Sequence, residues 1–282
     1  MIGIYDSGFG GLTVLRAVRS LLPQYDYTYL GDNGRAPYGG RDMDTVLDFA
    51  EQCVERLFEE GCSLVVVACH TVSCTALRHL QRRYSPEPSG RRRILGVTIP
   101  AAEAAVALSV GHIGILGTSR TVQSGTFTTE IAKLATHRVS AVAAPLLTPI
   151  VEEALEQTDI ARLAVARYVA EFGDIDTLVL ACTHYPLLRQ AFDEAVPVNV
   201  KVLDPSLHIA QRLVDWLERH PGFVDAGTGH LNVLCTGHPE VFRHHGRRFL
   251  GAEMPIVQHI AEEHGRLAHR QQVQVVRGQV LR

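Results

Sequence analysis

Two segments of the sequence, far apart along the chain, nearly repeat each other, and each ends in a cysteine. Residues 64–71 contain Cys69, and residues 178–184 contain Cys182. In each segment a run of apolar residues leads directly into the thiol, and threonine and histidine follow. Two thiols in matched surroundings could act on opposite faces of one substrate atom, one removing a proton and the other supplying one. A hydrolase with a single nucleophilic cysteine would need only one such segment.

The proton chemistry of the two thiols depends on the elements that carry them. Ligand sites of open α/β sheets lie beyond the carboxyl ends of parallel strands. We expect a helix to begin after each cysteine, where its positive end would lower the pKa of the thiol and attract a carboxylate. His184 is expected to accept the proton of Cys182, and Asp6 that of Cys69. The alternative for Asp6 is a purely structural role as the cap of the following helix.

Two glycine-rich turns lie near the N-terminus, at residues 6–11 and 31–40. The first lacks the third glycine of the dinucleotide-binding motif and the lysine of a P-loop, so phosphate binding is not predicted. In the second, the hydroxyl group of Tyr38 and the backbone N–H of Gly39 could donate to a substrate carboxylate. The alternative for this turn is an ordinary surface loop.

Predicted strands and helices alternate along the chain, which is typical of parallel sheets flanked by helices. Strands are predicted at 2–5, 27–30, 64–68, 94–97, 112–116, 139–143, 177–181 and 231–235. Helices are predicted at 12–22, 45–60, 73–83, 101–109, 121–135, 149–157, 159–171, 206–219 and 239–249. The second half echoes the first, so we predict an α/β fold of two pseudosymmetric domains with the site in the cleft between them.

The predicted domains are residues 1–97 together with 206–265, and residues 98–205. The strand at 231–235 is expected to return to the first domain, because one strand cannot form a sheet alone. Residues 266–282 are predicted to be a tail without regular structure.

Composition narrows the function classes. A length of 282 residues with 46% apolar side chains is enough for one large or two medium domains. A net charge of −3 does not indicate a nucleic-acid or membrane partner. The six cysteines show no CxxC pair, so we expect free thiols, no metal site and a cytoplasmic location. No apolar run is long enough to predict a transmembrane helix, and no signal peptide is expected.

The motifs together resemble the glutamate racemases of the aspartate/glutamate racemase superfamily. They occur in order between residue 2 and about residue 251 and are specific only as a set. The matching pieces are Asp6-Ser7-Gly8-x-Gly10-Gly11-Leu12-Thr13-Val14; Gly31-Asp32 with Arg35-x-Pro37-Tyr38-Gly39; Val67-Ala68-Cys69-x-Thr71; Gly117-Thr118 with Thr121 and Ser124; Pro145-Leu146-x-x-Pro149-x-Val151-Glu152-Glu153; Leu180-x-Cys182-Thr183-His184-Tyr185-Pro186-Leu187; and Thr236-Gly237 with Phe242 and Phe249-Leu250-Gly251.

The resemblance implies a racemase without cofactor or metal, which binds glutamate between two α/β domains and supplies D-glutamate for peptidoglycan. Carried over by position, Cys69 and Cys182 would be the two bases, and Asp6, Glu152 and His184 would support them. Substrate contacts would fall on Asp6, Ser7, Pro37, Tyr38, Gly39, His70, Thr71, Thr118, Thr121, Thr183 and His184. The family also implies a homodimer. Its expected binding partner is a small-molecule substrate, and neither nucleic acid nor a membrane is involved.

The sequence departs from the family at His70, where asparagine is usual. Histidine is larger and would narrow the pocket, and as a cation near neutral pH it would lower the pKa of the adjacent Cys69. His70 leaves open a racemase or isomerase acting on aspartate or another small carboxylate. Two further alternatives also stay open: a weakly active homologue with a binding or regulatory role, and a decarboxylase or isomerase that uses a single cysteine.

Overall fold

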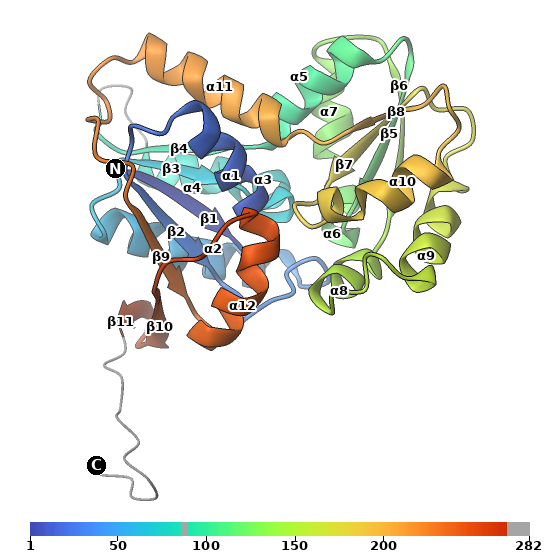
Figure 1. Cartoon of the computed structure of the whole chain (residues 1–282). Coiled ribbons are helices and arrows are strands. Elements are labelled where there is room, and N and C mark those ends of the chain that lie inside the picture. Colours follow the sequence, from blue (N-terminus) through green and yellow to red (C-terminus); the bar gives the residue numbers. More distant parts are fainter. Residues whose placement is uncertain (86–89, 270–282) are drawn as a thin grey trace, which may run out of the picture.

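The structure is a computed structural model that describes residues 1–85 and 90–269. Two sheets organise the chain, and Figure 1 shows them side by side, each with helices packed on it. Helices are formed by the segments α1 (Leu12–Leu21), α2 (Met43–Glu59), α3 (His70–Thr75), α4 (Leu77–Tyr84), α5 (Thr98–Leu108), α6 (Ser119–Gln123), α7 (Thr126–Ala132), α8 (Leu147–Glu152), α9 (Asp159–Val169), α10 (Arg189–Ala195), α11 (Ser206–Arg219) and α12 (Pro239–Leu250), with a 3₁₀ turn, η1, at Tyr185–Leu188. The predicted α/β fold is thus confirmed.

The larger sheet has seven strands in the order β11-β10-β9-β2-β1-β3-β4. Its strands are β1 (Ile2–Asp6), β2 (Tyr27–Gly31), β3 (Leu64–Val67), β4 (Arg93–Gly96), β9 (Leu231–Cys235), β10 (Val257–Glu263) and β11 (Arg266–His269). Neighbours are parallel except β10 and β11. The central strands β1, β2 and β3 are buried along their whole length, as strands covered on both faces must be. We call this sheet and its helices the large lobe.

The smaller sheet has four parallel strands in the order β6-β5-β7-β8. They are β5 (His112–Gly117), β6 (Arg138–Ala143), β7 (Thr177–Ala181) and β8 (Lys201–Leu203). We call this sheet and its helices the small lobe. The chain passes from the large lobe through α5 to β5 and returns from β8 through α11 to β9, and α5 and α11 contact each other. The carboxyl ends of β1, β3 and β7 therefore deliver Asp6, Cys69 and Cys182 to the junction of the lobes.

Two helices predicted as continuous are each divided in two. The segment 73–83 is α3 followed by α4, and α3 begins earlier, at His70. Two hydroxyl groups of α3 bond to backbone carbonyls rather than to solvent, Ser73 to Val67 and Thr75 to Thr71, a competition that weakens regular helix. The segment 121–135 is α6 followed by α7, because Gly125 adopts a left-handed φ of 64°.

The C-terminal part contains more sheet than predicted. The strand at 231–235 does pair with β2 of the large lobe, but β10 follows it in the same sheet, and β11 pairs antiparallel with β10. The prediction of a tail from residue 266 is therefore wrong for residues 266–269, and residues 270–282 lie outside the described part. Only Val257 and Ile260 of β10 are buried, so the strand lacks the strong apolar pattern that marks β1 or β3.

Candidate active site

The junction of the two lobes contains a cavity of about 220 Å³ that both cysteines line. Cys69 follows β3 in the large lobe, and Cys182 follows β7 in the small lobe. Most of the predicted site residues line the same cavity, namely Ser7, Pro37, Tyr38, Gly39, Cys69, His70, Thr71, Thr118, Glu152, Cys182, Thr183 and His184. Two do not: Asp6 is fully buried behind the wall, and Thr121 lies behind Thr118, whose hydroxyl group it meets at 3.0 Å.

The Cys69 thiol is held in an environment that keeps it protonated. Cys69 is the N-cap residue of α3, as predicted, but its side chain makes no capping hydrogen bond; its sulfur lies 3.4 Å from the hydroxyl oxygen of Ser7. Burial, together with the charges of Asp6 and Cys182, raises the pKa of the Cys69 thiol to about 12. The expectation that the helix end would lower this pKa is wrong, because desolvation of a thiolate in a buried site outweighs the partial charge of a short helix.

The Cys182 thiol has a different environment, built around an imidazole. The 3₁₀ turn η1, not an α-helix, follows it, so the predicted helix N-terminus is absent there. The His184 Nδ1 atom lies 3.9 Å from the Cys182 sulfur, and its Nε2 atom lies 3.1 Å from Glu152 Oε1. Burial opposes a charge on His184, but the bonds to Cys182 and Glu152 outweigh it and raise the pKa of the imidazole to about 10.

Asp6 links the two lobes directly. One of its carboxylate oxygens accepts the backbone N–H of Gly8, and the other accepts the Thr183 hydroxyl group at 3.3 Å. Burial raises the pKa of Asp6, although the charge of His184 works in the opposite direction. The hydroxyl group of Ser7, not the carboxylate of Asp6, contacts the Cys69 sulfur, so the structure does not place Asp6 as the group that accepts the Cys69 proton. Asp6 instead fixes the turn after β1 and the threonine beside Cys182.

The hydroxyl group of Tyr38 points away from the cavity, contrary to the sequence-based expectation. It donates to the fully buried carboxylate of Asp32 and accepts a hydrogen bond from Tyr5 at 3.2 Å. Arg35 also binds Asp32, with its Nε atom 2.8 and 2.9 Å from the two oxygens. Tyr38 therefore anchors the loop, whose residues 36–40 line the cavity.

His70 lines the cavity as a neutral side chain. Only 3% of it is exposed, and burial lowers its pKa to about 4. Its ring lies 5.8 Å from that of Phe127, and its Nδ1 atom has no hydrogen-bond partner among the described residues. A cation at this position, which would have lowered the pKa of Cys69, is thus ruled out near neutral pH.

Sequence reasoning missed two polar residues of the cavity, Ser119 and Thr148. The hydroxyl oxygen of Thr148 lies 3.8 Å from the Cys182 sulfur, on α8, which also carries Glu152. Thr148 stands inside the segment 145–153, already singled out for its prolines and glutamates, so its place in that segment was the available signal.

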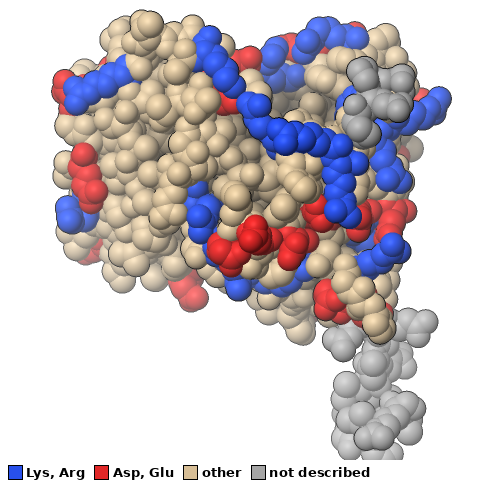
Figure 2. All heavy atoms as spheres, turned by 180° about the vertical axis from the view of Figure 1, so that it is seen from behind, with Lys and Arg blue, Asp and Glu red and all other residues tan. Residues whose placement is uncertain are grey.

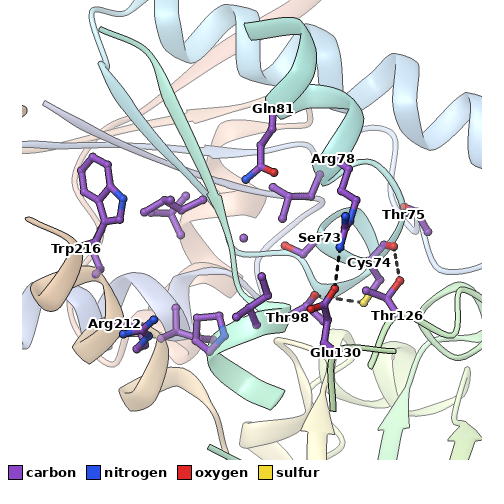
Figure 3. Close-up of a pocket in the computed structure, with 18 of the residues that line it drawn as sticks. Ser73, Cys74, Thr75, Arg78, Gln81, Thr98, Thr126, Glu130, Arg212 and Trp216 are labelled. Atoms are coloured by element: carbon purple, nitrogen blue, oxygen red, sulfur yellow. Dashed lines mark hydrogen bonds and ion pairs between the residues drawn. The ribbon is translucent and has the colours of Figure 1, made fainter. Parts of the chain in front are cut away.

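A second and larger cavity, of about 490 Å³, lies on the other side of α3 (Figure 3). His70 and Thr71 of α3 line the first cavity, whereas Ser73, Cys74 and Thr75 line the second. Its charged walls are largely neutralised: Arg78 pairs with Glu130 at 3.0 Å, and Arg212 with Glu103 at 2.8 Å. On the face turned away in Figure 1, basic and acidic side chains likewise lie next to each other (Figure 2).

Among residues 1–85 and 90–269, no group of three or more histidine, cysteine or acidic side chains is placed to hold a metal ion. Within the same residues, every helix is too short or too polar to cross a membrane.

Comparison with known proteins places these features in a family. The family model described as Asp/Glu/Hydantoin racemase matches residues 13–213. The glutamate racemase of Roseobacter denitrificans is 37% identical over 263 residues, covering 88% of this chain and 96% of that protein.

Solved structures show the same relationship. A glutamate racemase from Bacillus anthracis superposes with a TM-score of 0.85 at 32% identity, over 94% of this chain and 98% of that one. The glutamate racemase of Francisella tularensis, crystallised in complex with D-glutamate, has a TM-score of 0.83 at 28% identity, over 92% of this chain and 97% of that one.

Proposed function

Because the chain belongs to the Asp/Glu/Hydantoin racemase family and is an amino-acid racemase, we propose that it interconverts L- and D-glutamate with two cysteine bases. The observation that carries the proposal is the cavity shared by Cys69 and Cys182, one thiol from each lobe. The relative crystallised with D-glutamate supports glutamate as the substrate.

The unlike environments of the two sulfurs suit a two-base reaction. In one direction, a Cys182 thiolate beside the His184 imidazolium removes the α-proton, and the Cys69 thiol donates its proton to the opposite face of the same carbon. The old C–H bond breaks toward one sulfur while a new C–H bond forms from the other. Solvent then returns the proton from Cys182 to Cys69. The hydroxyl groups of Thr71 and Thr183 line the cavity and can hold the substrate carboxylate, which stabilises the carbanion-like state.

The test is exchange of the α-proton in deuterated water. The wild type should incorporate deuterium at Cα of L- and D-glutamate, as read by NMR, and interconvert them, as read by circular dichroism. Cys69→Ala and Cys182→Ala should each lower racemisation about a thousandfold, because each removes one of two required proton carriers. Cys62→Ala is the matched control, since this thiol is buried in the core of the large lobe and should leave turnover within about twofold. Full turnover in either active-site variant would refute the two-base mechanism.

A different small amino-acid substrate, such as aspartate, is the second candidate, and His70 favours it. The buried imidazole fills space at the cavity wall where the family usually has a smaller amide. A panel of amino acids assayed with the wild type separates the two candidates. Faster turnover of aspartate than of glutamate would replace the proposed substrate and keep the cysteine chemistry.

We further propose a cytoplasmic homodimer that supplies D-glutamate for peptidoglycan. All six cysteines are free thiols, which supports a reducing compartment. The proposed domains are residues 1–97 with 206–269, and 98–205, which extends the first domain to the end of β11. Light scattering tests the dimer, and rescue of a bacterium dependent on external D-glutamate tests the supply.

A further inference from the structure

The last helix of the large lobe, α12, reaches across the junction to the small lobe. Arg248, near its C-terminal end, donates through Nη2 to the backbone carbonyl of Val151 and to the carboxylate of Glu156. Val151 precedes Glu152, the last residue of α8 and the hydrogen-bond partner of His184. Arg248 therefore holds the turn of backbone from which Glu152 projects.

The next residue of α12 contacts the other member of the pair. The Phe249 ring meets the His184 ring edge to face, with centroids 5.2 Å apart and an interplanar angle of 79°, the geometry that aromatic pairs prefer. Phe249 is fully buried and packs on Phe9, 6.0 Å away, which fixes its own position. Two consecutive residues of one helix thus hold the hydrogen-bonded pair: Arg248 binds the backbone next to Glu152, and Phe249 packs on His184.

The end of α8 needs such support. This helix has six residues, and Ala154, just beyond it, adopts a left-handed φ of 57°, which is unfavourable for a side chain with a Cβ atom. The Glu152 side chain is 31% exposed, so core packing alone does not fix it. The carbonyl of Val151 accepts the backbone N–H of Ala154 at 3.1 Å and the Arg248 guanidinium as well. Arg248 thus helps to hold the turn that fixes the backbone position of Glu152.

We propose that Arg248 and Phe249 are positioning residues that align Glu152 and His184 on the Cys182 side of the reaction, an inference that rests on the proposed two-base function. A displacement of about 1 Å in a reacting group can cost about a hundredfold in rate. Neither residue lines the cavity, so both act through the pair they hold.

The experiment compares Arg248→Met with Arg247→Met in the full chain. Arg247 is the neighbouring residue of the same helix and pairs with exposed Glu253 at 3.2 Å, so its loss is the matched control. Turnover of L- and D-glutamate is measured with protiated and α-deuterated substrate. Because the enantiomers have equal free energy, kcat/KM must fall by one factor in both directions, and only the isotope effects report which step has slowed.

For Arg248→Met we expect kcat/KM to fall about tenfold or more. The deuterium isotope effect on kcat/KM should rise for only one of the two directions of racemisation. His184→Gln is the reference variant, and Arg248→Met should raise the isotope effect in the same direction as it does. Arg247→Met should match the wild type in both. Arg248→Lys keeps a cation but lacks the paired N–H donors, so its kcat/KM should lie between those of the wild type and Arg248→Met. If Arg248→Met does not fold, Arg248→Lys carries the same directional test.

Wild-type kinetics in a folded Arg248→Met would overturn the inference, as would isotope effects that rise equally in both directions. A wild type that racemises no glutamate defeats the proposed function instead. The positioning role is then still read from ¹⁵N-histidine NMR, which needs no turnover. His184 signals should shift in Arg248→Met and stay in place in Arg247→Met, and unchanged His184 signals in both would reject the positioning role.

Discussion

At the scale of single residues, His70 shows how burial decides the chemistry of a side chain. The pKa of its imidazole falls to about 4 in the folded protein, against an ordinary value of 6.5. Between these two pH values the unfolded chain binds a proton at His70 and the folded chain does not. The free energy of unfolding therefore decreases as the pH falls through this window. Well above pH 6.5 the residue is neutral in both states and contributes no pH dependence.

This difference predicts a pH-dependent stability gap between the wild type and His70→Asn. On lowering the pH from 7.5 to 5, the wild type should lose about 2 kcal/mol of unfolding free energy more than the variant does, because asparagine does not titrate. Urea unfolding at both pH values measures the gap. Other groups, such as His184, titrate in both proteins and cancel in the comparison. Equal losses in the two proteins would mean that His70 is accessible to protons in the folded state.

The residues found from sequence alone are those whose role follows from position along a strand. Cys69 and Cys182 come after buried strands, so the fold class was enough to predict that each lies at the carboxyl edge of its own sheet. Tyr38 could not be assigned in this way. Its hydroxyl partner, Asp32, is close in sequence, but the direction of the phenol depends on Tyr5 and on the half-buried Arg35, which only the folded chain brings together.

At the scale of elements, the break between α6 and α7 depends on one glycine. Gly125 has a φ of 64°, and a Cβ atom placed on it would meet nothing within 4 Å. Gly125→Ala should therefore destabilise the protein by about 1–2 kcal/mol through backbone strain alone. Gly111→Ala is the matched control, since its Cβ atom would also meet nothing and its φ is not positive. Urea unfolding should show the control within about 0.5 kcal/mol of the wild type, and similar values for both would exclude strain as the cause.

The elements that sequence analysis missed share a physical reason. β8 has three residues, β11 has four and lies at an edge of its sheet, and β10 has only two buried positions, so few of their side chains are buried. An alternating pattern needs several buried positions to stand out from the background. The central strands, buried at every position, gave a clear signal, and the three missed strands did not.

At the scale of the whole molecule, the cavity is closed by contacts that cross from one lobe to the other. On the Cys69 side, Thr71 meets Thr118 at 2.9 Å, and on the Cys182 side Thr183 meets Asp6. A third crossing lies over the loop that carries Tyr38. The backbone N–H of Arg120 donates to the carbonyl of Gly39, and its guanidinium donates twice to that of Arg41, at 2.6 and 2.9 Å. The small lobe thus holds the loop over the cavity.

Loss of this crossing should weaken binding more than it slows the chemistry. In Arg120→Met the loop is not held in advance and must be ordered when the substrate binds. The bound state and the transition state share this cost, so KM should rise about fivefold while kcat stays within about twofold. Arg138→Met is the matched control, because Arg138 starts β6 at the end of the sheet away from the cavity and pairs with exposed Asp174. Initial rates in both directions give the split. A fall in kcat at constant KM would instead place Arg120 in the alignment of the reacting groups, and the lobes would then have to act on the chemical step itself.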